Sequence, residues 1–440
     1  MINRIKELKN NSSFMRYFTN TSWVMGEKLL QIVSSIIIGV WVARYLGPEN
    51  LGILSYAQSY VAIFLSFSTL GLNGILVREL VLNPQDKNNL VGTSFILQSL
   101  GSILLMSVLV IGIQFTKNTD LLNKIIIILG TVTFFQSFGV IKSYFESIVE
   151  SKYIVYVSVI GMVISSVLKV YLILTEAPLI YFVYVILSDS IVIALGQIYF
   201  YKKKKLSLKS WTFSAQKAKK LLKDSWPLIL SGIIVSVYMK VDQIMIKEIM
   251  DTASVGQYSA AVRLSEAWYF IPIVISSSLF PAVVNAKKIS EELYYKRLQK
   301  LYDLMVIISL SIAIPFTFLS EFLVQFLYGD AYYLSGGVLS IHIWTGIFVF
   351  LGVSRGNWIL NENLQRYTSL YLGIGMLINL ILNWFFIPKF GIIGAAYATL
   401  ISQSVSVLFA PYLFKATRIS FYMMIKSLTF YNIIINSKKS

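Results

Sequence analysis

Cysteine is absent from this chain of 440 residues, and histidine occurs once. The lack of cysteine excludes disulfides, a thiolate nucleophile and a cysteine-ligated metal, and a single histidine argues against a histidine-based catalytic or metal centre. Charged residues make up only 13% of the chain, whereas hydrophobic residues make up 56% and the mean hydropathy is +0.70. That composition excludes an ordinary soluble domain and indicates an integral membrane protein. We therefore expect neither a resident metal nor a cofactor.

An internal repeat relates the two halves of the chain. Trp23 and Trp226 each open a long apolar run, at an offset of 203 residues, and Gly52 and Gly256 follow these runs at an offset of 204. Each glycine lies in a turn that leads into another apolar helix. Duplicated membrane halves are typical of transporters, in which the substrate path lies at the interface between the repeats.

Apolar runs long enough to cross a bilayer core of roughly 30 Å recur along the chain. They predict twelve transmembrane helices, near residues 18–45, 52–76, 90–115, 122–146, 153–175, 178–201, 225–249, 254–284, 301–327, 335–360, 366–387 and 391–415. The predicted fold is all-α, with two repeated six-helix bundles around a central cavity. The predicted domains are a cytoplasmic N-terminal segment (1–17), an N-terminal six-helix bundle (18–201), a basic cytoplasmic linker (202–224), a C-terminal six-helix bundle (225–415) and a cytoplasmic tail (416–440).

The distribution of lysine and arginine predicts the orientation. Loops on the side of the N-terminus hold 27 of these residues, nine of them in the central loop from Lys202 to Lys223, against five on the opposite side. The positive-inside rule then places both termini in the cytoplasm. The net charge of +17 is explained by topology and attraction to anionic lipid, and it does not predict nucleic-acid binding. Loops on the outer side are short and offer no outer domain for a sugar polymerase or ligase, so we expect no enzyme.

Polar side chains inside the predicted helices are the candidate binding groups, since ionisable residues in membrane spans usually serve function. In the seventh helix, Gly232, Ser236, Lys240, Gln243 and Lys247 share one face. The predicted substrate-binding residues lie in helices one, seven and eight: Lys28, Gln31, Ser236, Lys240, Gln243, Arg263 and Glu266. No catalytic residue is predicted.

The repeat provides a comparison for the two interior cations. Lys240 corresponds to Ile37, and Arg263 corresponds to Ser59, so the scaffold does not require a cation at either position and a role in substrate binding is favoured. The alternative is an internal ion pair of these cations with Glu266 or Glu27. Asp242 lies two residues from Lys240, points away from the polar face, and is interpreted as structural.

A proline predicts a bend in the eighth helix. Pro272 removes a backbone hydrogen bond there and clashes with the preceding turn. Alternating access requires a helix that bends or rocks beside a fixed site. We therefore predict that Pro272 is a hinge, with a kink that only fits the helix to its neighbours as the alternative.

Several helix junctions resemble those of a known superfamily. Residues 43–52 read ARYLGPENLG, residues 255–258 read VGQY after Asp242, residues 279–281 read LFP, and residues 388–399 read PKFGIIGAAYAT. In this order they resemble the junctions of bacterial polysaccharide-transport proteins. These belong to the multidrug/oligosaccharidyl-lipid/polysaccharide exporter superfamily, whose oligosaccharide branch includes the O-antigen flippases.

The resemblance implies a function for the cationic interior. It implies a flippase in the bacterial inner membrane that moves an undecaprenyl-diphosphate-linked oligosaccharide, an O-antigen (lipopolysaccharide) or capsule repeat unit, from the cytoplasmic to the outer leaflet by alternating access. Its partners would be the polyprenyl-diphosphate-linked oligosaccharide, membrane lipids and a glycan polymerase. The alternative is a cation-coupled multidrug exporter of the same fold, for which Glu27, Asp189 and Glu266 are candidate acids.

Overall fold

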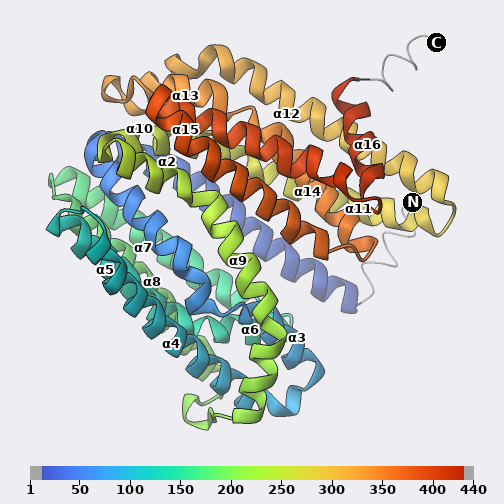
Figure 1. The fold of residues 1–440 in the computed structure, drawn as a ribbon. Coiled ribbons are helices and arrows are strands. Elements are labelled where there is room, and N and C mark those ends of the chain that lie inside the picture. Colours follow the sequence, from blue (N-terminus) through green and yellow to red (C-terminus); the bar gives the residue numbers. More distant parts are fainter. Residues whose placement is uncertain (1–11, 431–440) are drawn as a thin grey trace. The chain divides into compact units, whose positions relative to one another are not determined.

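The computed structural model describes residues 12–430, and this part of the chain is built from helices without strands (Figure 1). The α-helices are α2 (Ser12–Thr69), α3 (Leu72–Leu82), α4 (Lys87–Gly112), α5 (Asp120–Gln136), α6 (Val140–Ser147), α7 (Lys152–Leu174), α8 (Leu179–Lys203), α9 (Ala215–Ile249), α10 (Thr252–Glu266), α11 (Phe270–Lys287), α12 (Glu291–Tyr328), α13 (Ser335–His342), α14 (Thr345–Asn361), α15 (Arg366–Ser404) and α16 (Arg418–Leu428). Short 3₁₀ segments and one π-helix (Val405–Phe409) join several of them.

Two of the long helices are broken at a glycine. Gly47 in α2 has φ 70° and Gly391 in α15 has φ 60°, backbone conformations that glycine adopts without the penalty a side chain would bring. A straight helix of 58 residues would extend roughly 85 Å, far more than one crossing requires. The breaks fall at the predicted junctions between helices one and two and between helices eleven and twelve.

Ten stretches in residues 12–430 are long and apolar enough to cross a membrane. Two of them, Thr19–Leu82 with 64 residues and Arg366–Leu413 with 48 residues, are the stretches that contain the glycine breaks. The prediction of an all-α integral membrane protein is confirmed. The count of twelve spans stays a prediction.

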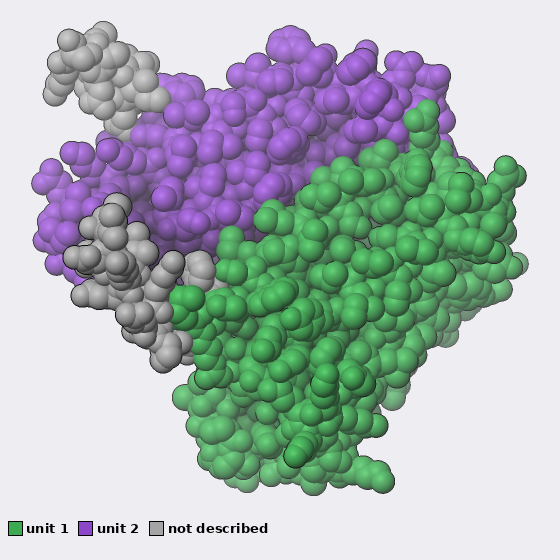
Figure 2. Space-filling view, turned by 180° about the vertical axis from the view of Figure 1, so that it is seen from behind, with its two compact units in different colours: residues 1–45, 57–236 green, residues 46–56, 237–440 purple. Residues whose placement is uncertain are grey.

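The chain divides into two compact units, coloured separately in Figure 2. Unit 1 comprises Met1–Tyr45 and Ala57–Ser236, and unit 2 comprises Leu46–Tyr56 and Val237–Ser440. The division falls inside α2 and α9, so each of these helices contributes to both units. The predicted domain boundaries at 18, 202 and 225 differ from this division and remain predictions, and residues 1–11 and 431–440 of the two predicted terminal segments lie outside the described residues.

In unit 1, the predicted linker packs against the helices. Trp211 donates a hydrogen bond from its indole nitrogen to the Tyr201 hydroxyl at 3.1 Å, and its ring lies 5.2 Å from that of Phe95. The backbone N–H of Ser214 donates to the Thr93 hydroxyl at 3.0 Å. From Ala215 onward the segment is the beginning of α9. The central segment is therefore ordered against unit 1.

Ion pairs fix the beginning of α9 to α3 within unit 1. Lys220 pairs with Glu79 at 2.7 Å, and Arg78 pairs with Asp224 at 2.5 Å and with Glu79 at 3.0 Å. The Glu79 carboxylate is buried, with 5% of its side chain exposed. Removing a cationic partner from a buried carboxylate leaves an uncompensated charge, which costs about 3–5 kcal/mol. The central segment is thus joined to α3 by pairs of both polarities, Lys220 with Glu79 and Asp224 with Arg78.

In unit 2, the two repeats meet at their equivalent glycines. A Cβ atom on Gly52 would lie 1.7 Å from the carbonyl oxygen of Thr252, and one on Gly256 would lie 1.9 Å from the carbonyl oxygen of Pro48. Thr252 and Pro48 are themselves related by the offset of 204 residues. The contact is therefore reciprocal, and its backbones approach more closely than any side chain allows.

Elsewhere in unit 2, α11, α12 and α14 to α16 pack around an aromatic and aliphatic core that includes Tyr294, Tyr302 and Trp358. The predicted cytoplasmic tail forms α16, which is bound to α12 through hydrogen bonds from Gln299 to the Met423 carbonyl at 3.0 Å and from Ser427 to Asp303 at 2.6 Å. Part of the tail is thus integral to unit 2.

Candidate functional site

A buried carboxylate in α9 is the centre of a polar network in unit 2. Asp242 is 5% exposed. It accepts hydrogen bonds from the Tyr258 hydroxyl at 2.8 Å, the Thr399 hydroxyl at 2.7 Å and the Asn383 amide at 2.8 Å. Asn383 also donates to the Asn379 side-chain oxygen at 3.0 Å. Helices α9, α10 and α15 therefore converge on one carboxylate.

No lysine, arginine or histidine of the described residues pairs with Asp242. A buried carboxylate that has only neutral partners is costly unless a cation or a proton compensates its charge. The side-chain oxygen of Asn383 is buried in the same network and has no hydrogen-bond partner in the described part of the chain. Carboxylate, amide and hydroxyl oxygens are the ligands that hard cations prefer. These residues can hold a small cation such as Na⁺, or a proton.

A small cavity adjoins this network. Its volume is about 40 Å³, and its lining includes Asp242, Gln243, Glu266 and His342. A water requires at least about 10–15 Å³, so the cavity admits an ion or a few waters and is too small for an organic molecule. His342 is buried and its Nδ1 lies 2.9 Å from the Ser265 hydroxyl.

The predicted cations of unit 2 lie near Glu266. The charge of Glu266 interacts with those of Lys240 and Arg263, which brings three of the predicted residues together. Within residues 12–430, neither Lys240 nor Arg263 forms a salt bridge or a side-chain hydrogen bond. Both side chains are partly exposed. The alternative of a direct ion pair with Glu266 is therefore not formed, and both cations retain donors for a ligand.

The predicted residues of helix one belong to unit 1. Lys28 donates to the Gln31 side-chain oxygen at 3.3 Å, and Gln31 donates to Glu27 at 2.9 Å. This chain of polar groups runs along one face of α2, and Lys28 is exposed. A local network of this kind keeps a cation and an acid close together without burying either of them.

The polar face of α9 makes protein contacts at both of its ends. A Cβ on Gly232 would lie 2.5 Å from the Ser66 hydroxyl within unit 1, and the Lys247 ammonium lies 5.2 Å from the centre of the Tyr56 ring within unit 2. Between these ends, Gln243 is buried, whereas Ser236 and Lys240 are partly exposed. Ser236 is the last residue of unit 1.

Pro272 lies just after a change of helix type. α10 ends at Glu266, residues Ala267–Tyr269 form a 3₁₀ turn, and α11 starts at Phe270. Proline is accommodated in the first turn of a helix, where its missing N–H removes no bond. The predicted eighth helix is thus interrupted immediately before Pro272, and its role as a hinge stays a prediction.

Sequence reasoning assigned Asp242 only a structural role, and its partners explain why. Asn383 and Thr399 lie 141 and 157 residues further along the chain. The available signal was the pair Asn379 and Asn383, which repeat at helical spacing in an otherwise apolar run. Two amides on one face of a membrane helix indicate a polar partner on another helix.

Residues 18–287 match the protein family described as "Polysaccharide biosynthesis protein". Over 220 residues the chain is 27% identical to the probable low-salt glycan biosynthesis flippase Agl15 of Haloferax volcanii, a match that covers 49% of this chain and 46% of that protein. The chain thus matches less than half of the length of this relative.

Two solved structures share the fold. The lipid II flippase MurJ in an inward closed conformation has a TM-score of 0.69 at 15% identity, with 96% of this chain and 93% of that chain covered. An inward-facing MATE family multidrug transporter of the MOP superfamily has a TM-score of 0.68 at 16% identity, with 88% and 95% covered. Because the family match extends over more than half of its residues, the chain belongs to the polysaccharide biosynthesis protein family.

Proposed function

We propose that the protein is a flippase for an undecaprenyl-diphosphate-linked oligosaccharide, an O-antigen or capsule repeat unit. It moves this lipid from the cytoplasmic to the outer leaflet of a bacterial inner membrane by alternating access, with both termini in the cytoplasm. The observation that carries the proposal is the pair of interior cations, Lys240 and Arg263, which share the neighbourhood of Glu266 in unit 2 and have no direct salt bridge among the described residues.

Diphosphate recognition explains these cations physically. Lysine and arginine bind phosphate oxygens through charge-assisted hydrogen bonds, which are shorter and stronger than neutral ones. Such binding requires no catalytic group. A cation inside a membrane span costs roughly 2.5–3.5 kcal/mol even on the lenient insertion scale. The equivalent positions of the other repeat, Ile37 and Ser59, carry no charge and avoid this cost. Substrate binding by Lys240 and Arg263 explains why the cost is tolerated in this repeat.

The comparisons support the proposed class of transported substrate, a lipid-linked glycan. The family is described by polysaccharide biosynthesis, and the relative Agl15 is named as a flippase of glycan biosynthesis. A neighbour in fold is named as a lipid II flippase. The passenger proposed here combines their chemistry: a glycan on a polyprenyl diphosphate. A glycan polymerase and the surrounding lipids are the proposed partners.

Two driving forces are available for the transport of such an anionic substrate. An inside-negative membrane potential pushes an anion outward by about 2.3 kcal/mol per charge per 100 mV. A cation bound at Asp242 would add coupling, because occupation of the site removes the cost of a buried, unpaired carboxylate. We propose that Asp242 is the coupling residue and that Lys240 and Arg263 bind the substrate.

The second candidate is a cation-coupled multidrug exporter. The buried Asp242 favours it, since a coupling site serves either cargo, and the likeness in fold to a MATE transporter supports it. The two candidates differ in the cargo. Export of cationic drugs that persists in Lys240→Ala and Arg263→Ala variants would favour the exporter.

A complementation assay tests the flippase. Arg263→Ala and Lys240→Ala are expected to abolish surface glycan while the protein still reaches the membrane, whereas Lys300→Ala, an exposed lysine on α12, serves as the matched control. Arg263→Lys should retain part of the surface glycan if Arg263 supplies only a positive charge. It should retain none if the guanidinium must bind the phosphate through two nitrogens. Normal surface glycan from both alanine variants would overturn the role of the cations.

A further inference from the structure

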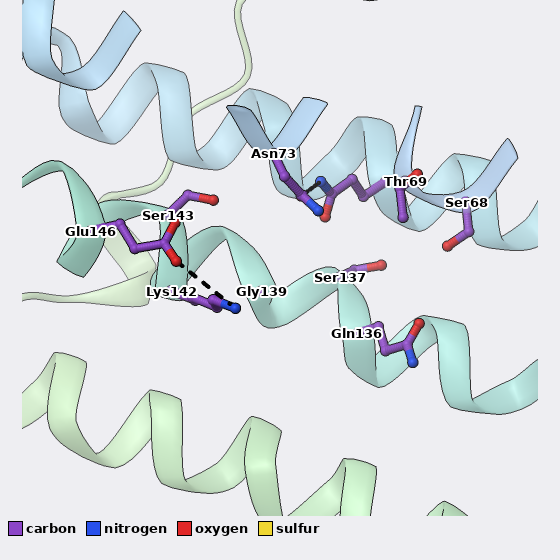
Figure 3. A pocket seen from close by; sticks show the side chains of 10 residues that line it. Ser68, Thr69, Asn73, Gln136, Ser137, Gly139, Lys142, Ser143 and Glu146 are labelled. Atoms are coloured by element: carbon purple, nitrogen blue, oxygen red, sulfur yellow. Dashed lines mark hydrogen bonds and ion pairs between the residues drawn. The ribbon is translucent and has the colours of Figure 1, made fainter. Parts of the chain in front are cut away.

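A polar pocket of about 260 Å³ lies within unit 1, where the end of α2 and helices α3 and α4 meet the segment from α5 to α6 (Figure 3). Of its ten lining residues, nine carry a hydroxyl, amide or charged group, and the tenth is Gly139. Ligand pockets are usually lined by apolar side chains with a few polar groups among them. This pocket has the reverse composition, in a chain of which 56% is hydrophobic.

Some of the lining groups are already satisfied by one another. Gln98 donates to the side-chain oxygen of Asn73 at 3.1 Å, and the Lys142 ammonium lies 3.8 Å from the Glu146 carboxylate, both drawn in Figure 3. The ion pair makes the net charge of the lining zero. The pocket therefore has no excess of cations with which to hold a phosphate.

Other lining groups are not satisfied. Thr69, Gln136 and Ser143 make no side-chain hydrogen bond to any residue in the range 12–430. Ser143 is 3% exposed, so its hydroxyl lies in the protein and is open only toward the pocket. Polar groups in such positions are normally paired with protein, water or a ligand. The pocket thus offers hydroxyl and amide groups that can both donate and accept.

Open space also adjoins the short 3₁₀ turn that separates α5 from α6. α5 ends at Gln136, residues Ser137–Gly139 form a 3₁₀ turn, and α6 starts at Val140. Gly139 has helical dihedral angles (φ −56°, ψ −14°), and a Cβ built on it meets no atom within 4 Å. A larger side chain at this position is therefore compatible with the backbone and extends into free volume.

We propose that this pocket binds a sugar ring of the lipid-linked oligosaccharide. A lining of hydroxyls and amides with no net charge matches the hydroxyl groups of a carbohydrate. It lacks the excess of cations that a phosphate requires and the apolar walls that a drug or lipid chain requires. The volume lies below the roughly 300–1,000 Å³ of pockets for drug-sized ligands, so it fits one or two rings. The lining helix ends, at Asn73 and Glu146, face the cytoplasm in the predicted topology, where the passenger is loaded.

The inference rests on the proposed function and deepens it. It assigns recognition of the glycan, and not recognition of the lipid diphosphate, to this pocket. The test uses the full chain in detergent micelles and two probes. One is lipid-linked oligosaccharide extracted from membranes of the source organism, and the other is undecaprenyl diphosphate without sugar. The measured quantity is the ratio of the two affinities.

Three variants change the pocket: Gln136→Leu and Ser143→Ala remove unpaired polar groups, and Gly139→Leu fills the space. Gln114→Leu and Ser107→Ala are matched controls on exposed positions of unit 1 outside the pocket. Wild type and controls are expected to bind the glycosylated lipid about tenfold more tightly than the sugarless lipid, equivalent to about 1.4 kcal/mol. The pocket variants should reduce this ratio toward one while the affinity for the sugarless lipid stays unchanged.

Each other result contradicts the inference. An unchanged ratio in Gly139→Leu would show that the pocket holds solvent only. An equal loss of both affinities would show a structural role. Wild-type protein that binds neither lipid would overturn the proposed function and the sugar site with it, whereas tight binding of both lipids at equal affinity would overturn the sugar site alone.

Discussion

Two substitutions of Asp242 separate the need for its hydrogen bonds from the need for its charge. The Asn383 amide donates to one carboxylate oxygen, and the hydroxyls of Tyr258 and Thr399 donate to the other. In Asp242→Asn, the side-chain oxygen can face Asn383 and the NH₂ group can face the hydroxyls, which accept as well as donate. Because a buried charge also disappears, we expect stability within about 1 kcal/mol of wild type.

Asp242→Leu removes the acceptor for all of these donors. Each buried donor left without a partner costs about 1–3 kcal/mol. Thr399 retains the Ala395 carbonyl at 3.0 Å and Asn383 retains the Asn379 oxygen at 3.0 Å, so only the Tyr258 hydroxyl loses its acceptor and the cost is about 1–3 kcal/mol. Thermal unfolding of the purified proteins in detergent should therefore give a Tm for Asp242→Leu several degrees below that of Asp242→Asn.

Cation binding provides the second readout of this pair. A ligand at 100 times its Kd stabilises the folded state by about 2.7 kcal/mol. If Asp242 and Asn383 hold Na⁺, sodium chloride should raise the Tm of wild type above its value in choline chloride, and the Asn variant should not respond. The reasoning is refuted if Asp242→Asn loses as much stability as Asp242→Leu and wild type is indifferent to sodium.

Three further predictions concern the backbone and one buried cation. Gly256→Ala should lower the yield of folded protein and the Tm far more than Gly26→Ala, because its Cβ would lie 1.9 Å from the Pro48 carbonyl whereas that of Gly26 meets no atom within 4 Å; equal Tm values would contradict the close contact. Pro272→Ala removes the fixed φ angle of the residue that follows the 3₁₀ turn and should slow flipping while lipid binding is retained, so an unchanged flipping rate in vesicles would remove the hinge. Arg355→Lys should cost about 1–3 kcal/mol, measured by thermal unfolding, since an ammonium cannot replace the guanidinium that donates to the Ser406 carbonyl at 3.2 Å and to the Val407 carbonyl at 2.5 Å.

The sequence predicted the helical membrane fold because apolar runs and their repeat are local patterns. It also placed the junctions near Gly47 and Gly391, where glycine and proline interrupt the runs. The family resemblance is confirmed by the match over residues 18–287, which includes the first of these junctions. Packing of the central basic segment was not predictable in the same way. The sequence predicted only a basic cytoplasmic linker there, but Lys220 pairs with Glu79, a residue 141 positions away, and Trp211 lies in an aromatic cluster.

The candidate site was only partly accessible from the sequence for the same reason. Helical spacing identified Lys240, and the repeat singled out Arg263 as a cation that the scaffold does not need, but spacing along one helix could not show that Asp242 meets α10 and α15. Arg355 is another example. An arginine near the end of a span usually extends to the interface, yet Arg355 is 5% exposed and lies 4.8 Å from the centre of the Tyr371 ring. The carbonyls of the π-helix that it satisfies follow from the tertiary fold.

Flipping of a lipid-linked oligosaccharide by the purified protein in vesicles tests the central claim most directly. The substrate is placed on one leaflet, and its arrival on the other is measured with an impermeant glycan-modifying reagent, for wild type, the Lys240→Ala/Arg263→Ala double variant and the Lys300→Ala control. The account predicts flipping by wild type and control and none by the double variant, with all proteins incorporated equally. Flipping at the wild-type rate by the double variant, or no flipping by wild type together with uptake of a cationic drug, would contradict it.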